Sequence, residues 1–163
     1  MERFKKKKEA IRNQIQVKAK HYRKYREIYF FEGTEPNSKY TALITDEREL
    51  PVILIRYSLR KKILVTTQHL FFIKGKSWVK IHGNELDRYD YMEHINYGAI
   101  YKTATKFRRM LYRPKIIFRI GKYRIVKKDG THLNLFFTRT RHPDCLNECI
   151  KRLKFVTDKY EAI

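Results

Sequence analysis

The side chains with the greatest capacity for chemistry lie near the C-terminal end, where His142, Cys145 and Cys149 follow one another at three- and four-residue steps. On a helix these three would share a face and offer ligands to a metal ion. Structural zinc requires four ligands, however, and the sequence holds no second Cys or His pair with zinc-like spacing. Cys149 also falls on an apolar stripe, where a buried thiol behaves as a small hydrophobic side chain. We therefore favour a core cysteine and expect no metal site, with a ligand or redox role as the alternative.

A run of carboxylates, Asp87, Asp90 and Glu93, precedes His94 and contains the elements of a general acid and a general base. Runs of this kind more often form a solvated face that balances neighbouring Lys and Arg side chains, and we favour that interpretation. The tyrosines interleaved with these charges suit either base stacking or a half-buried sheet. The six glycines are scattered singly, without a phosphate-binding loop or a nucleophile elbow. We therefore expect no catalysis and no cofactor.

The most informative chemical property of the chain is its positive charge. Its 163 residues carry 38 Lys and Arg against 17 Asp and Glu, a formal net charge of +21. Residues 1–26 hold a net charge of +9 and residues 106–128 a net charge of +10, whereas the rest of the chain is nearly balanced. Charge that is concentrated in this way predicts a polyanion or an acidic surface as the partner. The alternative is two solvated faces of a basic protein.

Length and composition limit the class of protein. A chain of this length is expected to form one domain with a buried core, and its 42% of hydrophobic residues excludes a wholly disordered chain. No apolar run reaches the roughly 18–20 residues of a membrane span. Two cysteines exclude a disulfide scaffold and favour a reducing compartment. We expect a cytoplasmic protein, at the membrane periphery if its partner is a lipid.

Two helices and a strand-rich middle must position these charges. Residues 2–30 lack Gly and Pro and are rich in helix formers, which predicts a basic helix with a narrow apolar stripe through Ile15 and Ala19. Gly33 then opens a turn-rich break that marks a boundary. The His-Pro-Asp sequence at residues 142–144 predicts the start of a second helix. Its apolar stripe comprises Leu146, Cys149, Ile150, Leu153, Val156 and Tyr160.

Short apolar runs rich in β-branched and aromatic residues predict strands between the helices. These runs cover residues 52–57, 63–67, 69–73 and 78–81, with a turn at residues 74–77. Residues 85–93 fit either a short helix or a strand.

Residues 115–137 are predicted to form an antiparallel meander whose last turn lies at residues 128–130. A three-residue loop with Gly130 in the left-handed conformation pairs Tyr123 with Leu135 and Ile125 with Leu133. A two-residue loop would place these side chains on opposite faces. Because the buried face determines the register, we predict the three-residue loop.

The first turn of this meander is predicted at Gly121. Its position fits a type II′ turn, which would set Arg119 directly opposite Arg124; a continuous strand with a bulge at Gly121 is the alternative. Like charges in opposite positions destabilise a strand pair. We therefore expect an anion against this pair, supplied either by an external partner or by the carboxylate run at residues 87–93.

The succession of elements resembles the pleckstrin-homology-like superfold, especially the bacterial PH-like and GRAM-type domains. The resemblance rests on the run Ile-Leu-Val-Thr-Thr-Gln-His-Leu-Phe-Phe at residues 63–72, on the strand at 78–81, on the Lys-Asp-Gly hairpin at 128–130 and on the helix that follows. It implies a mainly β, α+β fold: a half-open antiparallel barrel capped by the C-terminal helix, with an extra basic helix at the N-terminus. The chain would then divide into a basic amphipathic helix at residues 1–32 and a PH-like domain at residues 33–163.

The resemblance also implies a binding module without catalysis, because many relatives bind inositol phosphates through the first strand-to-strand loop. The matching residues here are Arg56, Arg60, Lys61 and Lys62. The second basic block adds Arg108, Arg109, Arg119, Lys122 and Arg124 as candidates for anion binding. The N-terminal helix contributes Lys5, Lys6, Lys7, Lys8, Lys18, Lys20, Arg23 and Lys24.

Two hypotheses about function follow from these residues. The first is a PH-like adaptor that docks on an acidic protein surface or on an anionic lipid, since each Lys or Arg near an anionic leaflet contributes about 1 kcal/mol. The alternative is an RNA- or DNA-binding protein that uses the basic helix and the strands of residues 106–128 as a phosphate track.

Overall fold

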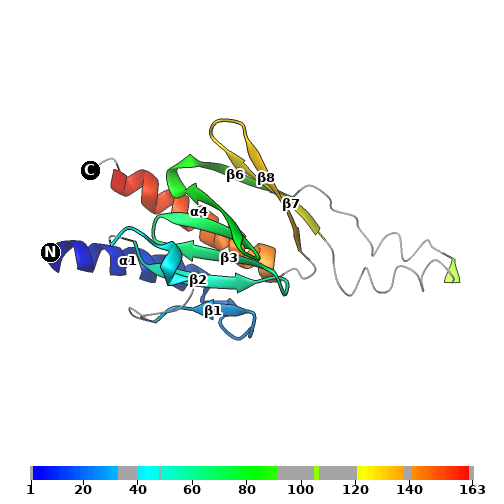
Figure 1. Cartoon of the computed structure of the whole chain (residues 1–163), viewed down its shortest axis with the longest axis horizontal. Coiled ribbons are helices and arrows are strands. Elements are labelled where there is room, and N and C mark those ends of the chain that lie inside the picture. Colours follow the sequence, from blue (N-terminus) through cyan, green and yellow to red (C-terminus); the bar gives the residue numbers. More distant parts are fainter. Residues whose placement is uncertain are drawn as a thin grey trace.

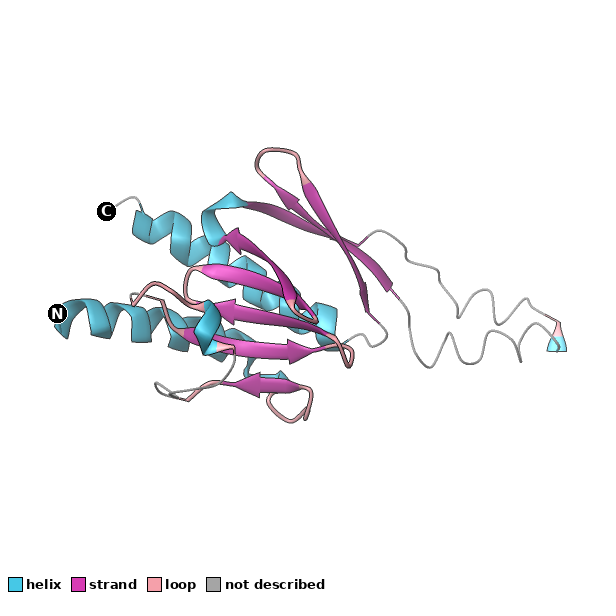
Figure 2. Cartoon of the chain, viewed as in Figure 1, coloured by secondary structure: helices cyan, strands magenta, loops and turns pink. Residues whose placement is uncertain are grey.

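The computed structural model describes residues 2–32, 40–47, 49–91, 105–106, 121–137 and 141–161. Within these ranges the chain folds into two helices, eight strands and three short 3₁₀ turns (Figures 1 and 2). The N-terminal part comprises α1 (Glu2–Ala19), η1 (Lys20–Tyr22), β1 (Ile28–Phe30) and η2 (Thr41–Leu43). The middle comprises β2 (Pro51–Arg56), β3 (Lys61–Thr66), β4 (His69–Lys74), β5 (Ser77–His82), η3 (Gly83–Glu85) and β6 (Leu86–Tyr91). The last part comprises β7 (Gly121–Lys127), β8 (His132–Phe137) and α4 (Arg141–Glu161).

Strands β1 to β5 form an antiparallel sheet in chain order. The four runs predicted as strands coincide with β2, β3, β4 and β5, and the predicted turn between β4 and β5 is present, with Gly75 at a φ of 63°. The ambiguous segment at residues 85–93 forms strand β6 over Leu86–Tyr91. The sequence pattern of residues 95–101 predicts an extended segment, and these residues lie outside the described ranges.

The helix predicted for residues 2–30 was too long, because α1 ends at Ala19 and a strand follows. Ile28, Tyr29 and Phe30 pair with Ile55, Leu54 and Ile53 of β2 instead of continuing the helix. These three residues are β-branched or aromatic and suit a pleated, half-buried surface. As strand β1 they form backbone hydrogen bonds with β2, and the side chains of Ile28 and Phe30 are buried. A helix that continued beyond the core would leave these two side chains in solvent.

The two faces of the five-stranded sheet are covered differently. On the inner face, α1 packs beside α4 and against β2 (Figure 1), and Ile15 and Ala19 of α1 belong to the same core cluster as Ile53 and Leu153. Gln16 further ties α1 to the sheet, since its Nε2 donates to the carbonyls of Phe31 and Val52 at 2.7 and 3.1 Å. The N-terminal helix therefore packs into the main core. The division into a separate domain at residues 33–163 stays a prediction.

The outer face of this sheet carries a second, smaller core. It contains Phe31, Leu54, Leu64, Phe71 and Ile73, against which Tyr40, Leu43 and Ile44 pack. The segment around η2 therefore covers the middle of the outer face.

Strands β6, β7 and β8 form a second antiparallel sheet with β7 at its centre. The predicted three-residue loop is confirmed: Tyr123 pairs with Leu135, Ile125 pairs with Leu133, and Gly130 has a φ of 81°. The predicted hairpin at Gly121 is wrong in its register. The cross-strand neighbours of Arg124 are Asp90 on β6 and Asn134 on β8, so no position opposite Arg124 is left for Arg119.

The C-terminal helix begins and packs as predicted. Helix α4 runs from Arg141 to Glu161, and Leu146, Cys149, Ile150, Leu153 and Val156 are buried along one stripe. The chain is thus an α+β protein with two antiparallel sheets and a C-terminal helix. In the part of the chain that the structure describes, no helix is long and apolar enough to cross a membrane.

Candidate functional site

The loop between β2 and β3 brings together the basic residues that the sequence assigned to anion binding. The turn closes through a hydrogen bond from the Lys61 N–H to Ser58 Oγ at 3.0 Å. The Tyr57 ring packs on the Phe137 ring at a centroid distance of 4.8 Å and anchors the base of the loop on the second sheet. Burial raises the pKa of the Tyr57 hydroxyl. The tip of the loop projects from this anchored base.

Two cross-strand pairs of like charges lie at this end of the sheet. Arg56 is the cross-strand partner of Lys62, and Lys61 is the partner of Lys74. The Arg60 carbonyl accepts a hydrogen bond from the Gly75 N–H at 2.9 Å, which joins this loop to the β4–β5 turn with its Lys76. We call this group the cationic hairpin end; it comprises Arg56, Arg60, Lys61, Lys62, Lys74 and Lys76.

The cationic hairpin end has no counterion among the residues that the structure describes. Within the described ranges, no carboxylate forms an ion pair with any of its six cations. Lys62 also contacts an aromatic ring, since its Nζ lies 5.8 Å from the centre of the Tyr40 ring. Like charges directly opposite each other in a sheet are destabilising. The arrangement therefore leaves a concentrated positive potential facing solvent, which an external anion would relieve.

A leucine stands at the tip of the cationic hairpin end. Leu59 is 98% exposed and lies between Ser58 and Arg60 in the β2–β3 loop. Single apolar residues on a surface are common and require no explanation. A fully exposed leucine at the tip of a loop that has cations around its base is a different arrangement. It combines an apolar side chain that can insert into a bilayer with cations that attract anionic groups.

The N-terminal cations divide between the two ends of the sheet. Lys8 Nζ donates to the carbonyl of Glu47 at 2.7 Å, which places the first turns of α1 near the start of β2 and away from the cationic hairpin end. The Arg56 N–H donates to the carbonyl of Glu27 at 2.8 Å, so the segment after η1 lies beside the cationic hairpin end. Arg23 pairs with Glu32 at 2.8 Å. The predicted basic helix is therefore not one continuous contact with the hairpin end; the other candidates on it are Lys5, Lys6, Lys7, Lys18, Lys20 and Lys24.

Of the second basic block, the structure describes Lys106 and the residues from Gly121 onward. Lys122 and Arg124 lie on β7, and Arg124 Nε donates to Asn134 Oδ1 at 3.4 Å. Arg108, Arg109 and Arg119 lie outside the described residues. The structure therefore brings Arg56, Arg60, Lys61 and Lys62 together with two residues that the sequence analysis missed, Lys74 and Lys76. The sequence did predict a turn at residues 74–77, which contains both lysines. It did not indicate that this turn would lie beside the β2–β3 loop.

The carboxylate run has local partners. Arg88 contacts Asp87 and Asp90, each at 2.9 Å, and Lys154 Nζ lies 3.9 Å from Asp87. Tyr89 stacks on Tyr123 at 5.5 Å, and burial raises the pKa of its hydroxyl. These contacts agree with a charge-balanced face for the described carboxylates and with a half-buried sheet for Tyr89.

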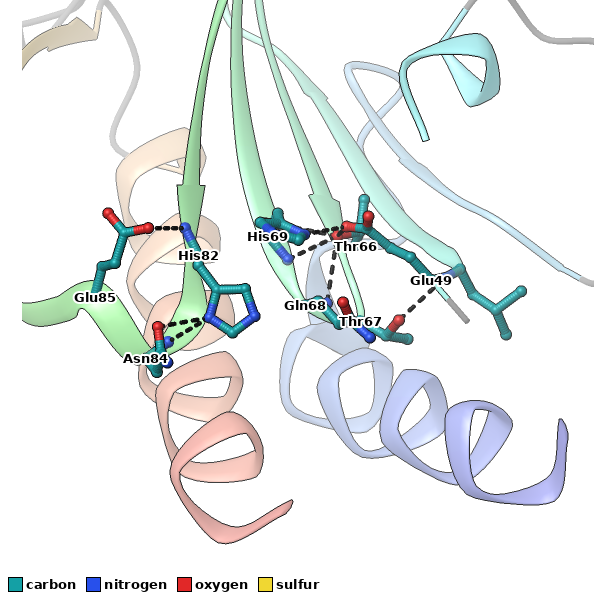
Figure 3. Close-up of polar contacts among 9 residues, drawn as sticks. Glu49, Thr66, Thr67, Gln68, His69, His82, Asn84 and Glu85 are labelled. Carbon is teal, nitrogen blue, oxygen red and sulfur yellow. Dashed lines mark hydrogen bonds and ion pairs between the residues drawn. The ribbon is translucent and has the colours of Figure 1, made fainter. Parts of the chain in front are cut away.

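Figure 3 shows a buried polar cluster at the opposite end of the sheet that sequence reasoning missed. His69 Nδ1 lies 2.8 Å from Glu49 Oε1, and the Thr66 hydroxyl contacts the same carboxylate oxygen. The Thr66 oxygen also accepts the His69 N–H at 2.8 Å. The side chain of Glu49 is fully buried and that of His69 nearly so, and Glu49 Oε2 has no hydrogen-bond partner among the described residues. Glu49 and His69 are twenty residues apart, and no motif links them in the sequence.

The neighbouring His82 completes this polar end. Its ring lies edge-on to that of His69 with centroids 4.6 Å apart, and its Nδ1 accepts the Asn84 N–H at 3.2 Å. In the described ranges, no three His, Cys, Asp or Glu side chains are close enough together to hold a metal ion. Cys145 and Cys149 are both buried and free, and a hydrogen bond with Cys145 together with burial raises the pKa of the Cys149 thiol. The thiols therefore belong to the core.

Comparisons with known proteins add no identification. No protein-family model, no curated protein and no solved structure matches this chain.

Proposed function

We propose that this chain is a non-catalytic docking module that binds anionic lipid surfaces through its cationic hairpin end. The observation that carries the proposal is the fully exposed Leu59 at the tip of a loop surrounded by six cations without a described counterion. The two antiparallel sheets followed by a C-terminal helix support the related proposal of a PH-like, half-open barrel. In that fold family the first strand-to-strand loop is the usual anion-binding position. The residues that match it here lie in the β2–β3 loop, which is the second such loop of this sheet because β1 precedes β2.

The physical chemistry favours a lipid surface over a soluble anion. Each cation near an anionic leaflet contributes about 1 kcal/mol, so several of the six suffice for reversible binding. Insertion of Leu59 adds about 2 kcal/mol, the free energy of removing a leucine side chain from water. A soluble inositol phosphate or an RNA phosphate would use the charges but would leave Leu59 in water.

Co-sedimentation with lipid vesicles tests the proposal. We expect binding to vesicles that contain phosphatidylserine, weak binding to pure phosphatidylcholine, and a loss of affinity as salt is raised. The Leu59→Ser change is expected to weaken binding about thirtyfold, because about 2 kcal/mol is lost. The Lys61→Ser change is expected to weaken it about fivefold.

Two matched variants control for nonspecific effects. Phe155→Ser removes a half-exposed apolar side chain from α4, and Lys151→Ser removes one positive charge from the same helix. Both are expected to leave vesicle binding unchanged. If Leu59→Ser and Phe155→Ser bind equally well, the proposed insertion is wrong. If the protein ignores anionic vesicles but retards RNA in a mobility-shift assay, nucleic-acid binding replaces the lipid proposal.

A further inference from the structure

Strand β5 is unusually exposed for a strand in this sheet. The strands β2, β3 and β4 are mostly buried, whereas Ser77, Trp78, Val79 and Lys80 of β5 are all exposed. Trp78 is 48% exposed on the outer face and Val79 is 51% exposed on the inner face. An edge strand that leaves an apolar residue accessible on each face is suited to pairing with another extended chain.

In the described part of the chain, Trp78 and Lys80 present backbone groups at this edge. The Gly83 N–H donates to the Gln68 carbonyl at 2.8 Å, whereas the His82 N–H donates to Glu85 Oε1 at 3.3 Å, away from β4. Because successive residues of a strand direct their backbone groups to alternate sides, Trp78 and Lys80 share the direction of His82. No backbone group elsewhere in the described chain bonds to Trp78 or Lys80 from the open side.

The charges along the edge define the chemistry of a partner. Lys80 projects on the same face as Trp78 and lies over the Phe71 ring at 5.5 Å. Lys74 and Lys76 flank the first end of β5, and Glu85 stands beyond the last end. A strand that runs antiparallel to β5 would place its C-terminal part beside Lys76 and would therefore need acidic residues there.

We propose that β5 binds an extended acidic segment of a partner protein by strand addition. The partner segment alternates: an acidic residue opposite Lys80, an aliphatic residue beside Val79, an aromatic residue beside Trp78 and acidic residues toward Lys76. A second copy of this chain is a poorer occupant, because a net charge of +21 on each copy opposes close association. The segment supplies the negative charge that the edge lacks.

The single tryptophan of the chain is Trp78, so its fluorescence reports directly on this edge. The probe is the synthetic peptide Thr-Val-Glu-Val-Phe-Val-Glu-Glu, capped at both ends. We expect saturable binding with a blue shift of Trp78 emission, and no shift with the same peptide in which every Glu is replaced by Lys. Lys80→Ala is expected to weaken binding about fivefold, and Lys80→Pro by a further tenfold or so, because Pro also removes the outward N–H.

A chemical change in the peptide provides a test that does not depend on the stability of any variant. Methylation of the backbone nitrogen of the Glu opposite Lys80 is expected to abolish binding to the unaltered protein. Equal affinity for the methylated and unmethylated peptides would overturn strand addition, as would binding that Lys80→Pro and Lys80→Ala weaken equally while both remain folded. A peptide-independent blue shift that grows with protein concentration would show self-association and would also overturn the proposal. Leu59→Ser is expected to leave peptide binding unchanged, which separates this surface from the lipid-docking loop.

Discussion

Replacing Ile15 with alanine tests whether helix α1 is part of the core. Ile15 is fully buried in the cluster that also contains Ile53 and Leu153. The change removes three carbon atoms, which is worth about 2.4 kcal/mol of transfer free energy at about 0.8 kcal/mol each. The cavity that remains adds to this loss, so we expect Ile15→Ala to lower the free energy of unfolding by about 3–4 kcal/mol. That is a large fraction of the stability of a domain of this size.

Urea denaturation, monitored by far-ultraviolet circular dichroism, measures this change in the free energy of unfolding. The matched control is Val17→Ala on the same helix, since Val17 is 61% exposed; it is expected to change stability by less than about 0.5 kcal/mol. If Ile15→Ala is as mild as Val17→Ala, α1 does not contribute to the core. By the same reasoning, a deletion of residues 1–26 removes Ile15, Gln16 and Ala19 together and is expected to unfold the chain.

Two further changes test the packing of η3 on α4 and the buried contacts of Glu49. Gly83→Ala would place a Cβ 2.6 Å from Thr157 Cγ2 and 3.0 Å from Leu153 Cγ, so we expect the free energy of unfolding to fall by about 1–3 kcal/mol. Adding Thr157→Ala to the same chain is expected to restore part of this loss. An unchanged melting temperature for Gly83→Ala would contradict the close packing of η3 on α4. Glu49→Ala leaves His69 and Thr66 without their buried partner, and we expect it to cost about 3 kcal/mol or more. A double-mutant cycle with His69→Ala should show strong coupling, and additive losses would refute a direct Glu49–His69 interaction.

The register of the second sheet was predictable because local chemistry and the buried face agreed. Gly130 supplies the left-handed residue of the loop, and this loop puts Tyr123, Ile125, Leu133 and Leu135 on one face. The apolar stripe of α4 was predictable for the same reason, since every residue of the stripe that the structure describes is buried.

Features that depend on contacts between distant segments were not predictable. The end of α1 at Ala19 is determined by the pairing of β1 with β2, more than twenty residues further along the chain. The turn assigned to Gly121 failed because β6 occupies the edge of β7 that the hairpin required. Lys74 joins Lys61 only through the register of β3 with β4, and Glu49 meets His69 only when the sheet has formed.

The most direct test of the lipid-docking account is the depth of residue 59 in a bilayer. A Leu59→Trp variant in a Trp78→Phe background carries one tryptophan, at the tip of the cationic hairpin end. With phosphatidylserine-containing vesicles we predict a blue shift of its emission and quenching by brominated acyl chains, as expected of a side chain in the acyl boundary region. Emission that stays at the wavelength of a water-exposed indole while the protein co-sediments with the vesicles would contradict the account.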